Sequence, residues 1–433
     1  MTTVAWLAVV IFAAAYVLIA TEWIHRVAAA LGGAVLMLLI GATDAEHAFF
    51  SEESGIDWNV IFLLLGMMLI VAVLQRTGAF EFVAIWAAKR ARGRPFRVMV
   101  ILVLITAVAS ALLDNVTTVL LIAPVTLLVC ERLAVPAAPF LIAEALASNI
   151  GGTATLVGDP PNIIIASRSG LSYNDFLIHL APLVVVLMVV FIGLCRWLFR
   201  RAFISDPQRA EAVMALRERD AIRDRRLLTI SLVVLAVVTA AFVLHTALDL
   251  EPSVVALVGG LVLLAASRLN VEQVAKDVEW PTLVFFAGLF VMVGSLVNTG
   301  VIDQLATAAV DATEGRLLLT SQVLLVASAG LSAIVDNIPY VATMSPIVAD
   351  LVQANGGIGS AQVLWWSLAL GADLGGNATA IGASANVVVL GIAERSGQRI
   401  SFWQFTKYGL VVTAVTIAIA APYVWLRYFV LAG

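Results

Sequence analysis

An internal repeat is the feature that most constrains this chain, because residues 58–162 recur as residues 280–386. The recurring positions are mainly polar residues, glycines and prolines that interrupt long apolar runs. At an offset of 222 the pairs include Trp58 and Trp280, Gly66 and Gly288, Thr77 and Thr299, Gly78 and Gly300, Asp114 and Asp336, Asn115 and Asn337, and Pro124 and Pro346. At an offset of 224 they are Gly151 and Gly375, Gly152 and Gly376, Thr155 and Thr379, Gly158 and Gly382, and Asn162 and Asn386. Two copies of one structural unit are therefore expected.

The composition places these units in a membrane. Hydrophobic residues make up 62% of the 433 residues and charged residues 12%, and the charged share is about half that of a soluble protein. Apolar runs of roughly 16 to 25 residues predict an all-α polytopic membrane protein. The two cysteines, Cys130 and Cys195, are far apart and form no zinc, redox or disulfide pattern. The first apolar run, Val4–Ala20, is expected to be a membrane helix and not a removable signal peptide.

Ten membrane-spanning segments are expected, five in each copy. They are Val4–Ile19, Val27–Ala42, Trp58–Leu74, Phe140–Ile165, Phe176–Leu198, Leu227–Leu244, Val254–Ala266, Trp280–Val297, Val363–Ala393 and Phe405–Leu426. Two further apolar stretches, 98–129 and 317–352, are too long for one helix and carry Asp-Asn near their middles. Each is predicted to form a re-entrant hairpin whose polar tip lies at membrane depth, where irregular backbone must line a protein cavity.

The basic residues predict the orientation. With the N-terminus outside, 22 of the 25 Lys and Arg fall on the cytoplasmic side, and the outer loops are acidic. Five crossings per copy is an odd number, so the second copy is inverted relative to the first and both termini lie outside. The predicted repeats are residues 1–199 and 227–433. A basic cytoplasmic connector over residues 200–226 joins them, and binding of anionic lipid by this connector is the alternative.

A Gly-Gly pair interrupts one apolar segment in each copy and predicts a broken helix. Such a break frees backbone amides and carbonyls at the facing helix ends, which can hold an anion and a cation respectively. The residues predicted to bind substrate or ion in the first copy are Asp114, Asn115, Thr117, Thr118, Asn149, Gly151, Gly152, Thr155, Asp159 and Asn162. Those in the second copy are Asp336, Asn337, Asp373, Gly375, Gly376, Asn377, Thr379, Ser384 and Asn386.

Carboxylates at membrane depth are costly and usually mark an ion path or a proton relay. Asp159, Asp114 and Asp336 are the candidates for proton coupling. Asp159 comes first because its counterpart in the second copy is Ala383. For Asp114 and Asp336 the structural alternative is capping of the hairpin tips, and capping can coexist with binding.

The predicted site lacks a cationic side chain, because no Lys, Arg or His occurs within residues 98–131, 133–167 or 317–394. A site of carboxylates and amides suits a cation, a proton or an uncharged polyhydroxyl solute better than a strongly charged oxyanion. The helix N-termini at the breaks can still hold a single negative charge.

In the blocks 111–125, 149–164 and 336–386 the chain resembles the arsenical pump and P-protein branch of the ion transporter superfamily. The resemblance implies an inverted repeat with two hairpins and two broken helices, in a homodimer whose transport domain moves against a scaffold. It implies H⁺ or Na⁺ as the coupling ion and leaves open whether a soluble ATPase subunit docks on the basic loops. In the sodium-coupled carboxylate transporters the hairpin tips resemble Ser-Asn-Thr. The aspartates at 114 and 336 depart from that pattern and would repel a dicarboxylate.

The sequence therefore predicts a secondary active transporter in the inner or plasma membrane of a bacterium, working by alternating access. The leading activity is arsenite or antimonite efflux in exchange for protons. A sodium/proton exchanger or an anion transporter, including one for carboxylates, is the alternative. An intramembrane enzyme with Asp114 and Asp336 as an aspartyl pair is disfavoured, because these residues occupy symmetric positions on opposite hairpins. The expected partners are a small ion or oxyacid, membrane lipid and a second copy of the chain, without a cofactor, a metal or nucleic acid.

Overall fold

The fold is helical throughout the part of the chain that the computed structural model describes, residues 2–21, 23–203, 214, 217–313 and 315–431. The helices of the first half are α1 (Thr3–Thr21), α2 (Arg26–Leu39), α3 (Ala45–Phe50), α4 (Trp58–Arg76), α5 (Ala79–Arg90), α6 (Pro95–Leu112), α7 (Asn115–Leu133), α8 (Ala138–Gly152), α9 (Pro160–Ser169), α10 (Tyr173–His179) and α11 (Ala181–Leu198). Those of the second half are α13 (Arg225–Leu248), α14 (Pro252–Ser267), α15 (Val271–Asp277), α16 (Trp280–Asn298), α17 (Val301–Ala312), α18 (Leu317–Ser332), α19 (Asn337–Ala354), α20 (Ile358–Ala361), α21 (Val363–Gly375), α22 (Ser384–Arg395) and α23 (Phe402–Trp425).

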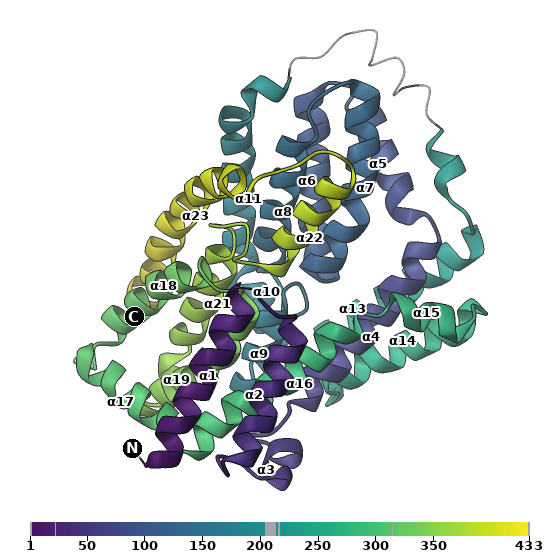
Figure 1. Ribbon diagram of the computed structural model, residues 1–433. Coiled ribbons are helices and arrows are strands. Elements are labelled where there is room, and N and C mark those ends of the chain that lie inside the picture. Colours follow the sequence, from purple (N-terminus) through teal and green to yellow (C-terminus); the bar gives the residue numbers. More distant parts are fainter. Residues whose placement is uncertain (1, 22, 204–213, 215–216, 314, 432–433) are drawn as a thin grey trace.

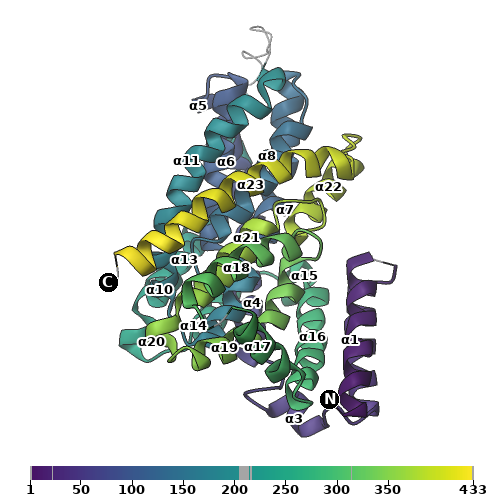
Figure 2. The same cartoon turned by 90° about the vertical axis from the view of Figure 1, so that its left-hand side faces the viewer.

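The two halves repeat helix by helix, as the duplicated sequence predicts. The pairs α6–α7 and α18–α19 form the two expected hairpins, and α8–α9 and α21–α22 form the two expected broken helices. The hairpins run toward the centre from opposite ends of the molecule (Figures 1 and 2). By length and apolar composition, eight described helices can cross a membrane, or nine if the bent pair α17 and α18 is counted as one span. The predicted fold class is confirmed: a polytopic, all-α inverted repeat.

Five described α-helices were not among the expected segments: α5, α17 and the short helices α3, α15 and α20. Of these, α5 and α17 are the longest. Each follows a Thr-Gly pair of the repeat, and the glycine takes a left-handed conformation, with φ of 80° at Gly78 and 70° at Gly300. Glycine adopts this conformation without steric cost, which explains why it occurs at both positions. The expected span Phe176–Leu198 also differs, since it is divided after His179 into α10 and α11, and Pro182 lies in the first turn of α11.

The two halves interlock by exchanging helix partners. Helix α4 packs on α14 of the second half, and α16 packs on α2 of the first half. A glycine in each crossing lets the backbones meet. A Cβ atom added to Gly66 would lie 2.3 Å from the carbonyl carbon of Ala256, and one added to Gly288 would lie 2.9 Å from that of Ala30. Both glycines thus serve helix packing, as small residues commonly do in membranes.

Gly66→Ala is expected to destabilise the protein, because the new methyl group would overlap the backbone of α14. Overpacking of this kind costs about 1–3 kcal/mol, which outweighs the gain in helix propensity. Thermal unfolding of the detergent-purified protein measures the effect. Gly32→Ala is the matched control, since a Cβ at Gly32 of α2 has no described neighbour within 4 Å. Equal melting temperatures for the two variants would contradict the packing role of Gly66.

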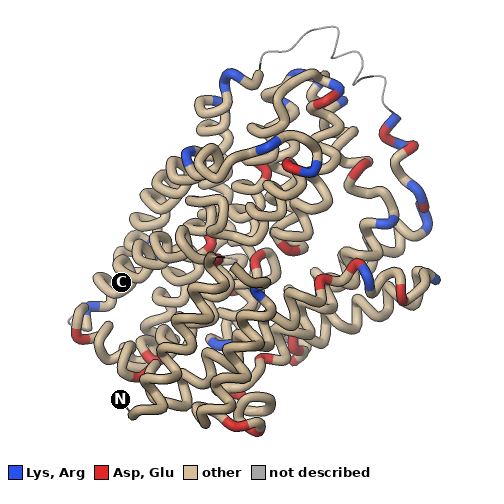
Figure 3. Tube along the Cα trace, viewed as in Figure 1, with Lys and Arg blue, Asp and Glu red and all other residues tan. Residues whose placement is uncertain are grey.

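The charged residues are distributed asymmetrically. Lys and Arg gather at the end where α5, α6 and α7 turn, whereas Asp and Glu dominate the opposite end (Figure 3). Part of the predicted basic connector, residues 204–213 and 215–216, lies outside the described residues. Its last part contacts α5 through two ion pairs, Lys89 with Glu218 at 2.6 Å and Arg223 with Glu81 at 2.9 Å. The hydrogen bond from Lys89 lowers the pKa of Glu218.

Candidate functional site

The two helix breaks are built alike. The side-chain amide of Asn162 donates to the carbonyls of Gly152 and Thr155, at 3.4 and 3.0 Å. Asn386 repeats this with the carbonyls of Gly376 and Thr379, at 2.8 and 2.9 Å. These bonds satisfy backbone groups that the breaks would otherwise leave unpaired in an apolar environment.

Each break is also tied to the first arm of its own hairpin. The hydroxyls of Thr155 and Thr379 donate to the carbonyls of Ala111 and Ala333. The glycines of the breaks allow the close approach. A Cβ atom at Gly151 would lie 2.3 Å from the carbonyl oxygen of Ala107, and one at Gly375 would lie 2.6 Å from backbone atoms of Ala329. A Cβ atom at Gly152 would lie 2.5 Å from the oxygen of Gly158, and the closest atom to one at Gly376 is the oxygen of Gly382, at 3.0 Å. Several predicted binding residues therefore have a structural task.

The hairpin tips are capped by their aspartates. Asp114 accepts a hydrogen bond from the backbone amide of Thr117 at 2.8 Å, and Asp336 accepts one from that of Ile338 at 3.0 Å. Asp336 also accepts a hydrogen bond from the hydroxyl of Ser384. Thr118, another predicted binding residue, is buried. The capping alternative is thus present at both tips, and at Asp336 the second carboxylate oxygen is bonded to Ser384.

Asp159 connects the two hairpins. Its carboxylate accepts a hydrogen bond from the side-chain amide of Asn115 at 2.8 Å and another from that of Asn337 at 3.3 Å. These asparagines begin α7 and α19, the second arms of the two hairpins. All three residues are at most 2% exposed. A carboxylate held by amide groups from both repeats is placed to sense their relative position.

A network of amides crosses from one repeat to the other. Asn115 also donates to Asn149 at 3.1 Å, and Asn149 donates to Asn377 and Asn386 at 2.9 and 3.2 Å. Asp373 lies beside this network, fully buried at the end of α21. The structure thus brings the predicted amide and carboxylate residues together between the repeats, at the meeting point of the hairpins and breaks.

Arg26 at the start of α2 reaches this region and corrects the expectation of a site without a cationic side chain. Its guanidinium donates to the hydroxyls of Ser384 at 2.9 Å and Thr282 at 3.3 Å, and it lies 5.5 Å from the centre of the Phe285 ring. Because Ser384 in turn donates to Asp336, the guanidinium is linked to the second hairpin tip. Residues 98–131, 133–167 and 317–394 indeed contain no Lys, Arg or His, but Arg26 lies outside these ranges and brings its guanidinium to the site.

A cavity of about 630 Å³ opens beside Arg26, and its polar lining includes Glu279, Thr282, Asp336 and Ser384. A narrow extension of about 20 Å³ reaches Asp114 at the other hairpin tip. Of the predicted site residues, Asp114, Asp336 and Ser384 line these spaces. Glu279 lines both spaces.

A second cavity of about 640 Å³ lies where α4, α9, α13 and α14 meet. It occupies the position related to the first cavity by the repeat, since Leu63 and Ile163 line it where Phe285 and Val387 line the other. No hairpin aspartate is among its described lining residues. The two cavities are therefore lined by equivalent helices, but only the first reaches the hairpin aspartates among the described residues.

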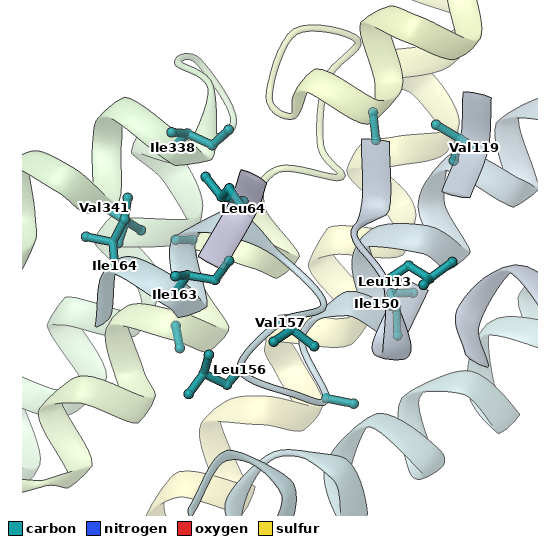
Figure 4. Close-up of a cluster of buried hydrophobic side chains, with 14 of the residues drawn as sticks. Leu64, Leu113, Val119, Ile150, Leu156, Val157, Ile163, Ile164, Ile338 and Val341 are labelled. Atoms are coloured by element: carbon teal, nitrogen blue, oxygen red, sulfur yellow. The ribbon is translucent and has the colours of Figure 1, made fainter. Parts of the chain in front are cut away.

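Figure 4 shows a cluster of buried apolar side chains, and members of this cluster line both cavities. Leu156 and Ile163 line the second cavity, and Leu64 and Ile338 line the extension of the first. These four side chains are between 2 and 4% exposed. The hairpin tips are thus reached from the first cavity only, within the described part of the chain.

Known proteins share this sequence and architecture. A family model described as citrate transporter (CitMHS) matches residues 16–371. An uncharacterized transporter of Mycobacterium tuberculosis is 58% identical over 424 residues, which cover 98% of this chain and 99% of the relative. The 46 kDa membrane protein of Mycobacterium leprae is 56% identical over 425 residues, with the same shares covered. The human P protein is 32% identical over 502 residues, which cover 98% of this chain and 60% of the P protein.

Among solved structures, the YdaH transporter of Alcanivorax borkumensis superposes with a TM-score of 0.60. The superposition covers 91% of this chain and 88% of that structure, at 15% sequence identity. This likeness concerns the fold.

Proposed function

The chain belongs to the citrate transporter family (CitMHS), and on that premise we propose that it moves a small oxyacid by alternating access, with arsenite or antimonite efflux in exchange for protons as its leading activity. Membership in this family makes it a multi-pass membrane transporter and not an intramembrane aspartyl enzyme. We further propose the bacterial plasma membrane as its location, with both termini outside.

The observation that carries the proposal is the composition of the cavity at the hairpin tips. Three carboxylates, from Asp114, Asp336 and Glu279, line the cavity and its extension together with one guanidinium. Near neutral pH arsenite is mainly the uncharged trihydroxide, whose O–H groups are donors. Carboxylates accept such bonds, and the Arg26 guanidinium can donate to a hydroxyl oxygen.

The two cavities support alternating access. One reaches the hairpin tips, and its counterpart in the other repeat ends at the apolar cluster of Figure 4. A transporter needs its site open to one side at a time, and inverted repeats are a common means of building two such states. Movement that opened the second cavity and closed the first would carry the same site to the other side.

Transport of a carboxylate is the second candidate, and Arg26 favours it. A guanidinium binds carboxylates through paired hydrogen bonds, and a cavity of about 630 Å³ is large enough for a small organic acid. The three carboxylates that share the lining count against a substrate with several negative charges.

Flux into proteoliposomes containing the full chain tests the proposal. We expect exchange of arsenite that accelerates when a pH gradient is imposed, because protons move in the opposite direction. Antimonite should compete with arsenite, whereas succinate, citrate, sodium and chloride should not. Citrate or succinate flux without arsenite flux would reject the arsenite assignment in favour of the carboxylate candidate, and flux driven by sodium at constant pH would reject proton exchange.

A further inference from the structure

At one pair of equivalent positions, the first repeat has an amide side chain and the second repeat has a carboxylate. Asn149 lies near the end of α8, and its counterpart at an offset of 224 is Asp373, near the end of α21. The side-chain amide of Asn149 donates to two acceptors, the side-chain oxygens of Asn377 at 2.9 Å and Asn386 at 3.2 Å. The first copy of this position thus supplies two N–H donors to two oxygens.

In the second copy Asp373 takes the place of Asn149, and an ionised carboxylate brings no donor of its own. Thr153 and Asn162, the counterparts of Asn377 and Asn386, lie next to its carboxyl group. The Thr153 hydroxyl is already used, since it donates to the carbonyl of Asn149 at 2.9 Å. The amide of Asn162 is used as well, because it donates to the carbonyls of the break, Thr155 among them at 3.0 Å.

Several buried side-chain oxygens at this position have no hydrogen-bond partner among the described residues. They are the two carboxylate oxygens of Asp373 and the side-chain oxygen of Asn162. Both residues are 0% exposed. The orientation of the Asn162 amide is supported by Asn386, which directs the same N–H group to the same carbonyls of the other break. Buried oxygens that receive no hydrogen bond are stabilised by a proton or a cation.

We propose that Asp373 carries the exchanged proton and, when protonated, donates its hydroxyl to the side-chain oxygen of Asn162. The acid then imitates the permanent N–H donor of Asn149 in the other repeat. Unlike an amide, it can release the proton, which is taken from water on one side of the membrane and returned to water on the other. This assignment rests on the proposed proton exchange and names the residue that performs it.

Asp159 is the neighbouring carboxylate, and its environment is the opposite one. It accepts N–H groups from Asn115 and Asn337, which stabilise a charged carboxylate. Asp159 interacts electrostatically with Asp373 and, more weakly, with Asp336 and Asp114. Two like charges in a dry site are costly, so the pair holds one proton, and the hydrogen bonds place that proton on Asp373.

The helices packed against α21 bring no other charge to this position. They are α8, α9, α18, α19 and α23. Glu144 on α8 is bonded to Thr126, and Tyr340 on α19 is bonded to Ser328. Among the described residues, Asp159 at the start of α9 is the titratable group on these helices that interacts with Asp373.

Infrared difference spectroscopy of the full chain in liposomes tests the proposal. The C=O stretch of a protonated carboxylic acid is distinct from that of a carboxylate and shifts in D₂O. We expect the wild-type spectrum to contain such a band that Asp373→Asn lacks and Asp159→Asn retains. Glu144→Gln is the control for a buried carboxyl outside the pair, and it should retain the Asp373 band. A spectrum of Asp373→Asn that still contains this band, or a wild-type band that disappears on adding sodium at fixed pH, would overturn the proposal.

Transport supplies the second readout. Asp373→Asn should lose the response of arsenite flux to a pH gradient, because its amide is a permanent donor to Asn162 and cannot release a proton. Asp373→Ser keeps an O–H donor and is the second variant should the first fail to fold. Unaltered pH dependence in a folded variant would overturn the assignment. If wild type exchanges no arsenite, the proposed substrate fails, whereas the infrared band still decides whether Asp373 holds a proton.

Discussion

Asp159→Asn is expected to abolish transport driven by a pH gradient while the protein stays folded. The carboxylate accepts amide groups from both hairpin tips, at 2.8 Å from Asn115 and 3.3 Å from Asn337. An asparagine turns its own N–H group toward one of these donors, so one bond is lost and the negative charge disappears. A hydrogen bond to a charged group contributes about 1.5–3 kcal/mol. The two hairpin tips would then no longer share a negatively charged acceptor.

Proton-driven flux in proteoliposomes measures this effect, with thermal unfolding as the test of folding. Asp350→Asn is the control, because Asp350 lies on α19, the helix that begins with Asn337, but is partly exposed and far along the helix from the tip. The control should transport like wild type. Normal pH-driven flux in Asp159→Asn would remove Asp159 from the mechanism.

Arg26→Gln is expected to separate the two candidate substrate classes. The guanidinium contacts Ser384 and Thr282 and lies on the cavity wall. Loss of a charged hydrogen bond, about 1.5–3 kcal/mol, weakens binding of an anion by roughly 10- to 100-fold. The uncharged trihydroxide of arsenite loses a neutral contact instead, about 1 kcal/mol or a factor of roughly five.

Binding of arsenite and of succinate to wild type and variant gives the comparison. Arg76→Gln serves as the control, because Arg76 forms an ion pair with Asp277 that is 30–34% exposed and lies outside the described cavity linings. It should leave both affinities unchanged. An equal, large loss for arsenite and succinate would show that the transported arsenite carries a charge or that Arg26 holds the cavity in shape.

Much of the fold could be predicted because the repeat doubles each signal. A single polar pair such as Asp114-Asn115 within an apolar run does not by itself indicate a hairpin tip. Its recurrence at residues 336 and 337 indicates that both copies interrupt the helix at the same place. The helices α5 and α17 escaped prediction. They are short, and only the Thr-Gly pair before each of them indicates where they begin.

The site was harder to predict, because an offset shows which residues recur and not what they touch. Asn162 and Asn386 recur because they brace the breaks, and sequence alone could not separate this task from binding. Arg26 was missed for the opposite reason. It lies outside the matched blocks, and its contact with Ser384 spans 358 residues. The unequal pair Asn149 and Asp373 was visible in the sequence, but its meaning depends on the hydrogen bonds around it.

The exchange of helix partners between the halves bears on how the chain is made. While the first half is being inserted into the membrane, the faces of α2 and α4 that later meet α16 and α14 have only lipid beside them. The tight glycine contacts at Gly66 and Gly288 form after the second half has followed. Either half synthesised alone would be left with these faces unpaired, and degradation by membrane proteases is its expected fate. Two halves produced together from a split gene should rescue one another, since each supplies the helix that the other lacks.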